Sequence, residues 1–180
     1  MDKIVKIIND EELPEDKLEC HLGEGILHKA FSIWIFRAPD EVLIQKRSSD
    51  KFLWPLYWSN TCCSHPRLYE SYEEGGRRRL REELGFVCDL EFLYKFEYHA
   101  RFEKEGRLIG SENEVCSVLI GKYNNEIISP NKKEVSAIKW IDFTNLEINF
   151  KSYEDKYTPW FIQEFYEIKK NYINRIKELF

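Results

Sequence analysis

The chain has 180 residues, of which 27 are basic and 32 acidic, so its formal net charge is −5 at pH 7. Nucleic-acid-binding domains are normally basic, and this balance argues against one. No apolar stretch approaches the roughly 18 residues of a membrane span, so we expect a cytoplasmic protein that does not enter a membrane. The length suits a single domain over residues 1–180, and we expect a monomer or a weak dimer.

Five cysteines, an odd number, occur in a chain long enough to fold around a hydrophobic core. The first ten residues also lack the long apolar region of a secretory signal. Disulfide frameworks belong mainly to small secreted domains, so we expect these cysteines to be free thiols, metal ligands or catalytic groups.

Segments rich in β-branched and aromatic residues predict strands. They span residues 4–8, 30–36, 42–44, 92–98, 115–120 and 135–141. Turn-forming sequences such as Ala38-Pro39-Asp40 and Glu105-Gly106 separate them.

Two helices are expected among these strands. Ser71 and Glu74 form a capping-box pattern and Gly85 suits the position after a helix end, which predicts a helix over 71–84. Gly75-Gly76 in its interior disfavours it by on the order of 1 kcal/mol per glycine, so tertiary contacts must hold it.

The second helix begins after Thr158, with Pro159 in its first turn. Apolar residues follow at helical spacing on one face, which we expect to pack on a sheet; they are Phe161, Phe165, Ile168, Tyr172, Ile176 and Leu179. Strands interleaved with these helices predict an α/β fold of the α+β sandwich kind, with a mixed sheet flanked by two helices.

Histidines and acidic residues suggest a metal site. His21, His28 and His65 are three of only four histidines, and the alternation of a strand would point Glu112 and Glu114 to one face. Neighbouring carboxylates repel unless a cation joins them. Imidazole with carboxylate suits Mn²⁺ or Zn²⁺, whereas Mg²⁺ prefers oxygen ligands. Taken singly, each histidine also suits a hydrogen-bonded structural role.

Cys63 lies two residues before His65, just ahead of the 71–84 helix, which suggests an activated thiolate. The alternative is a small buried apolar residue. Glu82 and Glu83 stand in the last turn of that helix, where the dipole disfavours anions. They have either a functional role or a pairing with Arg78 and Arg79 on a solvated face.

Six motifs occur in an order and at spacings that resemble the type I isopentenyl-diphosphate isomerases, a branch of the Nudix superfamily. They are Leu27-His28-Lys29-Ala30-Phe31-Ser32 with Trp34, Trp54-Pro55, Trp58-Ser59-Asn60, Cys62-Cys63-Ser64-His65-Pro66, Arg78-Arg79-Leu80-Arg81-Glu82-Glu83-Leu84-Gly85 and Glu112-Asn113-Glu114-Val115-Cys116. The resemblance covers most of residues 4–165 and implies the Nudix fold.

The sequence departs from the hydrolase form of the Nudix box, as the isomerase branch does. Ser64 stands at its leading glycine, Glu70 follows at the expected distance, and Arg79 replaces a glutamate of the hydrolases. Within the family, Leu56 replaces a glycine common after the tryptophan-proline pair, and Gly75-Gly76 replace better helix formers. These departures bear on the geometry of the substrate loop and of the box helix.

The resemblance implies conversion of isopentenyl diphosphate to dimethylallyl diphosphate through a tertiary carbocation, in isoprenoid biosynthesis. One ion, Mn²⁺, Zn²⁺ or Mg²⁺, would be bound by the three histidines and two glutamates, His21, His28, His65, Glu112 and Glu114. A second ion, Mg²⁺ arriving with the diphosphate, would be held by Glu83 and the backbone carbonyl of Cys63. Lys17, Arg47, Lys51 and Arg79 match the basic residues around the diphosphate.

The resemblance also assigns catalytic roles. Glu114 would deliver a proton to the methylene carbon, Cys63 would remove one from the adjacent carbon, and Tyr98 would tune the protonation of Glu114. The ring of Trp160 would lie beside the cation. Because Phe161 and not Trp160 falls on the apolar stripe, we expect a free Trp160 side chain; the alternative is a tryptophan that packs the helix start.

Two other functions fit the same residues. A Nudix pyrophosphohydrolase acting on a nucleoside diphosphate derivative would not need Cys63. A metal-stabilised binding domain would use the histidines and glutamates only to hold its fold.

Overall fold

The computed structural model describes residues 3–180, so residues 1 and 2 of the expected domain lie outside it. The strands are β1 (Lys3–Ile8), β2 (Glu11–Asp16), β3 (His28–Ala38), β4 (Glu41–Arg47), β5 (Trp58–Ser59), β6 (Cys62–Ser64), β7 (Glu91–Lys104), β8 (Arg107–Lys122) and β9 (Val135–Asp142). Every predicted strand lies within one of these, and the predicted mixed sheet is confirmed. That residues 1–180 form one domain stays a prediction.

The described residues form more helices than the two that the sequence predicted. They are α1 (Lys17–His21), α2 (Tyr72–Leu84), α3 (Leu146–Tyr153), the 3-10 turn η1 (Glu154–Lys156), α4 (Pro159–Glu167), the π-helical turn η2 (Ile168–Tyr172) and α5 (Ile173–Lys177). The capping box of Ser71 with Glu74 is present at the start of α2, and Gly85 ends it with a φ of 79°.

The expected C-terminal helix begins at Pro159 but is not continuous. Thr158 occupies the N-cap position without a side-chain hydrogen bond, and η2 interrupts the helix after α4. Within the widened turn, Tyr172 stacks on Tyr94 of β7 with ring centroids 4.8 Å apart. Four residues of the predicted apolar stripe, Phe161, Phe165, Ile168 and Ile176, are buried in the core, and the other two, Tyr172 and Leu179, are half-buried against it.

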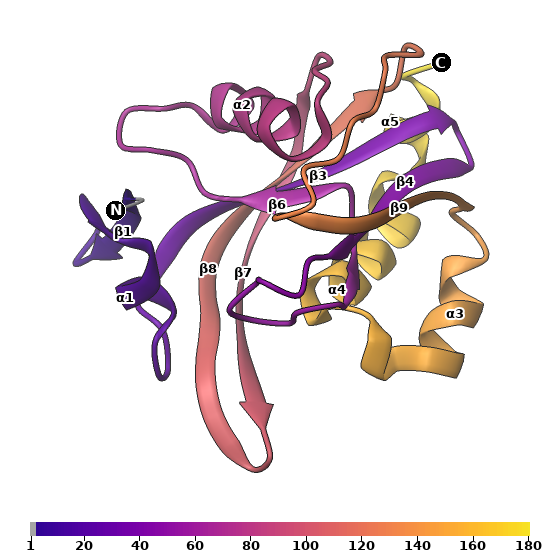
Figure 1. Cartoon of the computed structure of the whole chain (residues 1–180). Coiled ribbons are helices and arrows are strands. Elements are labelled where there is room, and N and C mark those ends of the chain that lie inside the picture. The colour runs from indigo at the N-terminus through magenta and orange to yellow at the C-terminus, as the bar shows by residue number, and fades with distance from the viewer. Residues whose placement is uncertain (1–2) are drawn as a thin grey trace.

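Strand β3 is the centre of the fold. It pairs in parallel with β8 and antiparallel with β1, β4 and β6. Phe31, Ile33 and Ile35 belong to the core beneath α2, whereas Trp34 and Phe36 belong to the core that α4 covers. Figure 1 shows the sheet between α2 on one face and α4 with α5 on the other.

Strand register gathers the polar motifs on one face. His28 of β3 lies opposite Glu114 of β8, and Tyr98 of β7 lies opposite Glu114 on the other side. Ser32, four residues beyond His28, lies opposite Cys63 of β6. Because paired residues point to the same face of a sheet, these side chains converge at one end of β3. The long β7–β8 hairpin extends beyond the sheet at this end (Figure 1).

The two glycines of α2 allow close approach between the helix and the sheet. A Cβ on Gly75 would lie 2.9 Å from Phe31 Cε1, and one on Gly76 would lie 2.7 Å from Leu90 Cδ1 and 3.2 Å from Leu119 Cδ1. The tertiary contacts that the sequence required of this helix are therefore present. Better helix formers at these positions would push α2 away from the sheet.

Replacing Gly76 by alanine is expected to destabilise the protein. Alanine favours a helix by up to about 1 kcal/mol over glycine, but overpacking a core costs about 1–3 kcal/mol. We expect a net loss of roughly 1 kcal/mol in the free energy of unfolding, measured by urea denaturation. Arg81→Ala, on the exposed side of α2, is the control and should leave stability unchanged. A Gly76→Ala protein as stable as the wild type would contradict the close approach.

Leu56 adopts a left-handed conformation with a φ of 65°. Only glycine enters this region without strain, which explains physically why a glycine is common at this position. No helix among residues 3–180 has the length and apolar character to cross a membrane.

Candidate active site and metal-binding cluster

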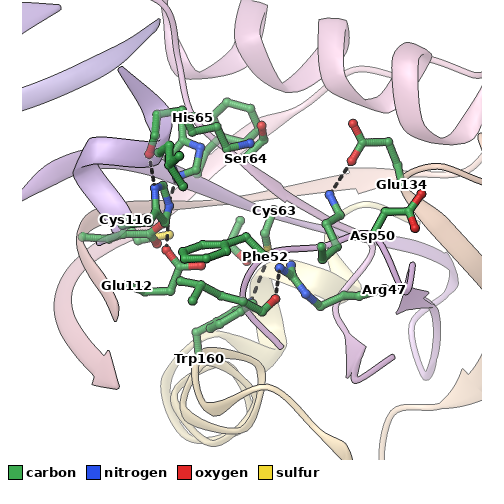
Figure 2. A pocket seen from close by; sticks show the side chains of 18 of the residues that line it. Arg47, Asp50, Phe52, Cys63, Ser64, His65, Glu112, Cys116, Glu134 and Trp160 are labelled. Atoms are coloured by element: carbon green, nitrogen blue, oxygen red, sulfur yellow. Dashed lines mark hydrogen bonds and ion pairs between the residues drawn. The ribbon is translucent and has the colours of Figure 1, made fainter. Parts of the chain in front are cut away.

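A cavity of about 460 Å³ opens at the end of β3 where the polar motifs converge. Figure 2 shows His65 and Glu112 on one side of it, Arg47, Asp50 and Glu134 on the other, and Phe52 with Cys63 between them. The predicted site residues that line it are Lys17, His21, Arg47, Lys51, Cys63, His65, Tyr98, Glu112, Glu114 and Trp160. Three others, His28, Arg79 and Glu83, do not contribute to the described wall.

The histidine and glutamate side chains form one buried cluster. One ligand atom from each of His21, His28, His65, Glu112 and Glu114 lies within 4.8 Å of all the others. His28 sits behind the cavity wall, and the ring nitrogens of His28 and His65 are 3.2 Å apart. The sequence prediction that these five residues come together is therefore correct in geometry.

Backbone carbonyls orient two of the imidazoles. His21 Nδ1 lies 2.5 Å from the carbonyl oxygen of Lys17, and His28 Nδ1 lies 2.7 Å from that of Ile26. A carbonyl only accepts, so each Nδ1 carries a hydrogen and each Nε2 is the nitrogen that faces the cluster. Second partners of this kind are typical of metal-binding histidines.

Both Nε2 atoms face carboxylate oxygens. His21 Nε2 is 3.0 Å from Glu112 Oε2, and His28 Nε2 is 3.5 Å from Glu114 Oε1. Glu112 Oε2 is buried without a hydrogen-bond partner in the described chain. A hydrogen on the imidazole or a bound cation can join such a pair, and ligands about 2 Å from a shared ion lie about 3 Å apart. The residues present fit a divalent metal ion.

Burial and the contacts within the cluster together set the ionisation of its side chains. Burial lowers the pKa of His65 well below its ordinary value, and the nearby His28 lowers it further. Burial opposes ionisation of Glu114, but hydrogen bonds from His28 and Tyr98 outweigh it and lower the pKa of that carboxyl. Tyr98 donates to Glu114 Oε2 at 2.6 Å. Neutral imidazole and ionised carboxylate are the forms that bind metals.

Cys63 is surrounded by polar side chains although it belongs to an apolar wall. Its thiol donates to Asn60 Oδ1 at 2.8 Å and accepts from Trp160 Nε1 at 3.1 Å. Burial, with Glu164 nearby, raises the pKa of Cys63 to about 12. This environment favours the thiol over a thiolate in the ligand-free protein, so an activated thiolate at Cys63 stays a prediction.

Trp160 is 2% exposed, so its side chain is not free as the sequence suggested. Its Nε1 also donates to Ser59 Oγ at 3.1 Å, and its ring meets that of Trp54 edge to face. Arg47 lies 5.3 Å from the ring centre. The residue packs the start of α4, as the alternative from sequence had it, and also lines the cavity beside Cys63; its place beside a cation stays a prediction.

The basic side chains Arg79 and Lys51, expected around a diphosphate, are paired with glutamates in the structure. Arg79 Nη2 is 2.6 Å from Glu83 Oε1 and 3.1 Å from Glu134 Oε1, and Lys51 also pairs with Glu134. Glu83 is 1% exposed, so its pairing with Arg79 is buried; the surface pairing considered from sequence applies to Glu82 alone. Arg79 braces this end of the site from behind the wall.

Other residues at this end were not singled out from sequence. Asp50, Lys133 and Glu134 line the cavity beside Arg47 and Lys51. Burial opposes ionisation of Glu134, but Lys51 and Arg79 outweigh it and lower its pKa to about 2. These residues lie in loops or at a strand start and belong to no recognisable motif, so only the fold brings them to the site.

The metal cluster makes a direct prediction. Metal-free protein dialysed against Mn²⁺ is expected to bind about one ion per chain through the five clustered side chains. Replacing His28 by alanine should weaken binding by at least about tenfold, measured by mass spectrometry of bound metal across a Mn²⁺ titration. His99→Ala, at an exposed histidine outside the cluster, should bind as the wild type does. Equal binding by the His28→Ala protein would contradict the site.

Comparisons with known proteins agree with this geometry. The chain matches the NUDIX domain family over residues 26–161. It is 38% identical over 163 residues to "Isopentenyl-diphosphate Delta-isomerase 1" of Photorhabdus laumondii, which covers 89% of this chain and 90% of that protein. It is 37% identical over 147 residues to the isopentenyl-diphosphate Delta-isomerase of Halorhodospira halophila, covering 82% of both chains.

Solved structures share the fold at low sequence identity. DR0079 from Deinococcus radiodurans superposes with a TM-score of 0.64 at 17% identity, covering 84% of this chain and 90% of that one. A MutT protein from Methanosarcina mazei gives a TM-score of 0.57 at 16% identity, covering 84% and 94%. At such identities the likeness concerns the fold alone.

Proposed function

Because this chain belongs to the isopentenyl-diphosphate Delta-isomerases within the NUDIX domain family, we propose that the cavity at the end of β3 is its active site. The activity is the conversion of isopentenyl diphosphate to dimethylallyl diphosphate in isoprenoid biosynthesis. The observation that carries the site is the placement of Cys63 and Glu114, a thiol and a carboxyl group, on the wall of one partly apolar cavity.

The two ends of the cavity suit the two ends of the substrate. At one end the basic side chains of Arg47, Lys51 and Lys133 outnumber the carboxylates of Asp50 and Glu134, and this net positive charge favours a diphosphate. Lys17 adds a further basic side chain to the cavity wall. Phe52, Leu53 and Trp160 line the wall near Cys63, where the isopentenyl group would lie away from water. Protonating an alkene creates a tertiary carbocation, and an aromatic face can stabilise a desolvated cation by about 2 kcal/mol. Trp160 is placed for that contact.

Proton transfer is assigned to Cys63 and Glu114, with Tyr98 beside the glutamate. In the ligand-free protein the proton rests on Cys63, whereas Glu114 is ionised. In that state Cys63 is the donor of the pair and Glu114 the acceptor. The order implied by the family, in which Glu114 donates first, requires a proton to move onto Glu114 when substrate binds. The two residues exchange roles when the reaction runs in reverse.

The five clustered residues would hold one metal ion, whose positive charge would offset the two carboxylates and fix Glu112 and Glu114. Three imidazoles favour Mn²⁺ or Zn²⁺ over Mg²⁺. The second site expected at Glu83 fits less well. Glu83 Oε1 accepts from Arg79, Oε2 accepts from Gln45, and the residue does not line the cavity. The residues present at Glu83 therefore do not fit Mg²⁺ in this state of the protein.

Phosphorus NMR of reactions with the metal-loaded protein distinguishes the isomerase from the pyrophosphohydrolase alternative. With isopentenyl diphosphate an isomerase leaves the diphosphate group intact, whereas a pyrophosphohydrolase given ADP-ribose releases nucleotide and sugar phosphates. We expect an intact diphosphate in the first reaction and no cleavage in the second. Cleavage of ADP-ribose without change of isopentenyl diphosphate would contradict the proposed function. Arg79, in place of a hydrolase glutamate, is consistent with the expected result.

A further inference from the structure

Behind Cys63 lies a carboxyl group that the proton-transfer scheme does not use. Glu164 of α4 is 0% exposed, and its Oε2 accepts hydrogen bonds from Ser32 Oγ at 2.5 Å and Trp34 Nε1 at 2.6 Å. Its other oxygen, Oε1, is buried and has no hydrogen-bond partner in the described part of the chain. Both donors are neutral, so these contacts do not compensate the charge of an ionised carboxylate.

The surroundings of Glu164 keep it neutral. Burial raises the pKa of Glu164 to about 8, and the negative charge of Glu114 on β8 adds to the effect. The other titratable groups that face it are Cys63 on β6, Tyr94 on β7 and Cys116 on β8. Each of these is an acid and none brings a positive charge. At pH 7 the side chain therefore holds a proton, for which Oε1 is the open position.

The hydrogen bonds run in one direction from Glu164 to the thiol. Ser32 Oγ has a single hydrogen, which it donates to Glu164, so toward Asn60 it can only accept. Asn60 Nδ2 donates to Ser32 Oγ at 2.7 Å and to the carbonyl of Ile33 at 3.0 Å. This orientation of the amide leaves Asn60 Oδ1 facing Cys63, whose thiol donates to it at 2.8 Å.

We propose that Glu164 is a positioning residue which, as a neutral acid, fixes the donor direction of Ser32 and, through the amide of Asn60, aims the thiol hydrogen of Cys63. The inference rests on the proposed isomerase function of the cavity. Ser32 lines the cavity and Glu164 does not, so Glu164 acts only through its neighbours.

Two substitutions at Glu164 separate its hydrogen bonds from its charge. Glu164→Gln is neutral, has nearly the same shape and keeps an acceptor for Ser32 and Trp34. Its kcat should stay within about threefold of the wild type at pH 7. Glu164→Leu removes the acceptor, frees the Ser32 hydroxyl and should lower kcat by about 10–100-fold. KM should change by less than about twofold, because the basic end of the cavity is untouched.

A substitution at Ser32 provides a second test of the proposal in case the Glu164→Leu protein does not fold. Ser32→Ala breaks the chain of hydrogen bonds while Glu164 and the packing of α4 remain. It should lower kcat as Glu164→Leu does, with an unfolding midpoint close to that of the wild type. If both variants keep full kcat while the wild type is active, the proposal is overturned. It is equally overturned if Glu164→Gln is as impaired as Glu164→Leu.

The pH dependence of stability tests whether Glu164 is neutral, independently of catalytic activity. Because burial raises the folded pKa of Glu164 to about 8, the native state binds this proton more tightly than the unfolded state. The urea midpoint of the wild type should therefore fall, relative to Glu164→Gln, as the pH rises from about 5 to about 8.

Parallel urea midpoints in the two proteins would show an ionised Glu164 and overturn the proposal. An inactive wild type would instead contradict the isomerase function, and the urea comparison would still decide the charge of Glu164.

Discussion

Replacing Cys63 by alanine is expected to lower kcat for isopentenyl diphosphate by on the order of 10³-fold, because one partner of the proton-transfer pair is removed. KM should change by less than about threefold, since the residues at the basic end of the cavity are unchanged. The measurement is steady-state turnover of the metal-loaded protein, with product quantified by chromatography.

Cys62→Ala is the matched control for this variant. Cys62 is adjacent in β6 but packs in the core beneath α2, and it does not line the cavity. Its replacement should lower stability by the cost of a small void and leave kcat near that of the wild type. Equal losses of turnover in the two variants would assign the effect to packing and contradict a chemical role for Cys63.

Replacing Glu114 by glutamine is expected to lower kcat by at least about 10³-fold, even at saturating metal. The change removes a carboxyl group that both joins the metal cluster and accepts from Tyr98 at 2.6 Å. An amide cannot exchange a proton with the substrate, so added metal should not restore turnover.

Glu112→Gln separates the metal-binding role from the proton-transfer role. Glu112 contacts His21 within the same cluster but is not bonded to Tyr98. Its replacement should weaken metal binding, and raising Mn²⁺ should recover most of the turnover. Titrating metal against kcat for both variants distinguishes them. If Glu114→Gln also recovered fully with Mn²⁺, Glu114 would be only a ligand.

The parts of the fold that the sequence predicted are those with strong local signals. Buried strands such as β3 and the capped helix α2 carry their own patterns of apolar residues and caps. Strand β2 was missed because its sequence is mostly acidic and it pairs only with β1 at the edge of the sheet. Helix α1 was missed because it has five residues, too few for a periodic pattern.

Some residues of the candidate site could likewise be predicted from the sequence, and others could not. The metal cluster could be predicted because histidine and alternating glutamate limit the possible chemistry. The contribution of Glu134 could not, because its pairing with Lys51 and Arg79 joins three separate segments. Glu164 lies on the face of the C-terminal helix that the sequence predicted to be apolar and packed. Only the packing of α4 against β3 brings its carboxyl group to Ser32 and Trp34.

The assignment of this cavity as an isomerase site is tested most directly by proton NMR of the metal-loaded protein with isopentenyl diphosphate in D₂O. Protonation by one residue and deprotonation by another should produce the two methyl signals of dimethylallyl diphosphate, with deuterium incorporated from solvent. The wild type should give both results and Cys63→Ala neither. An unchanged substrate spectrum with wild-type protein that binds metal and is folded would contradict the account.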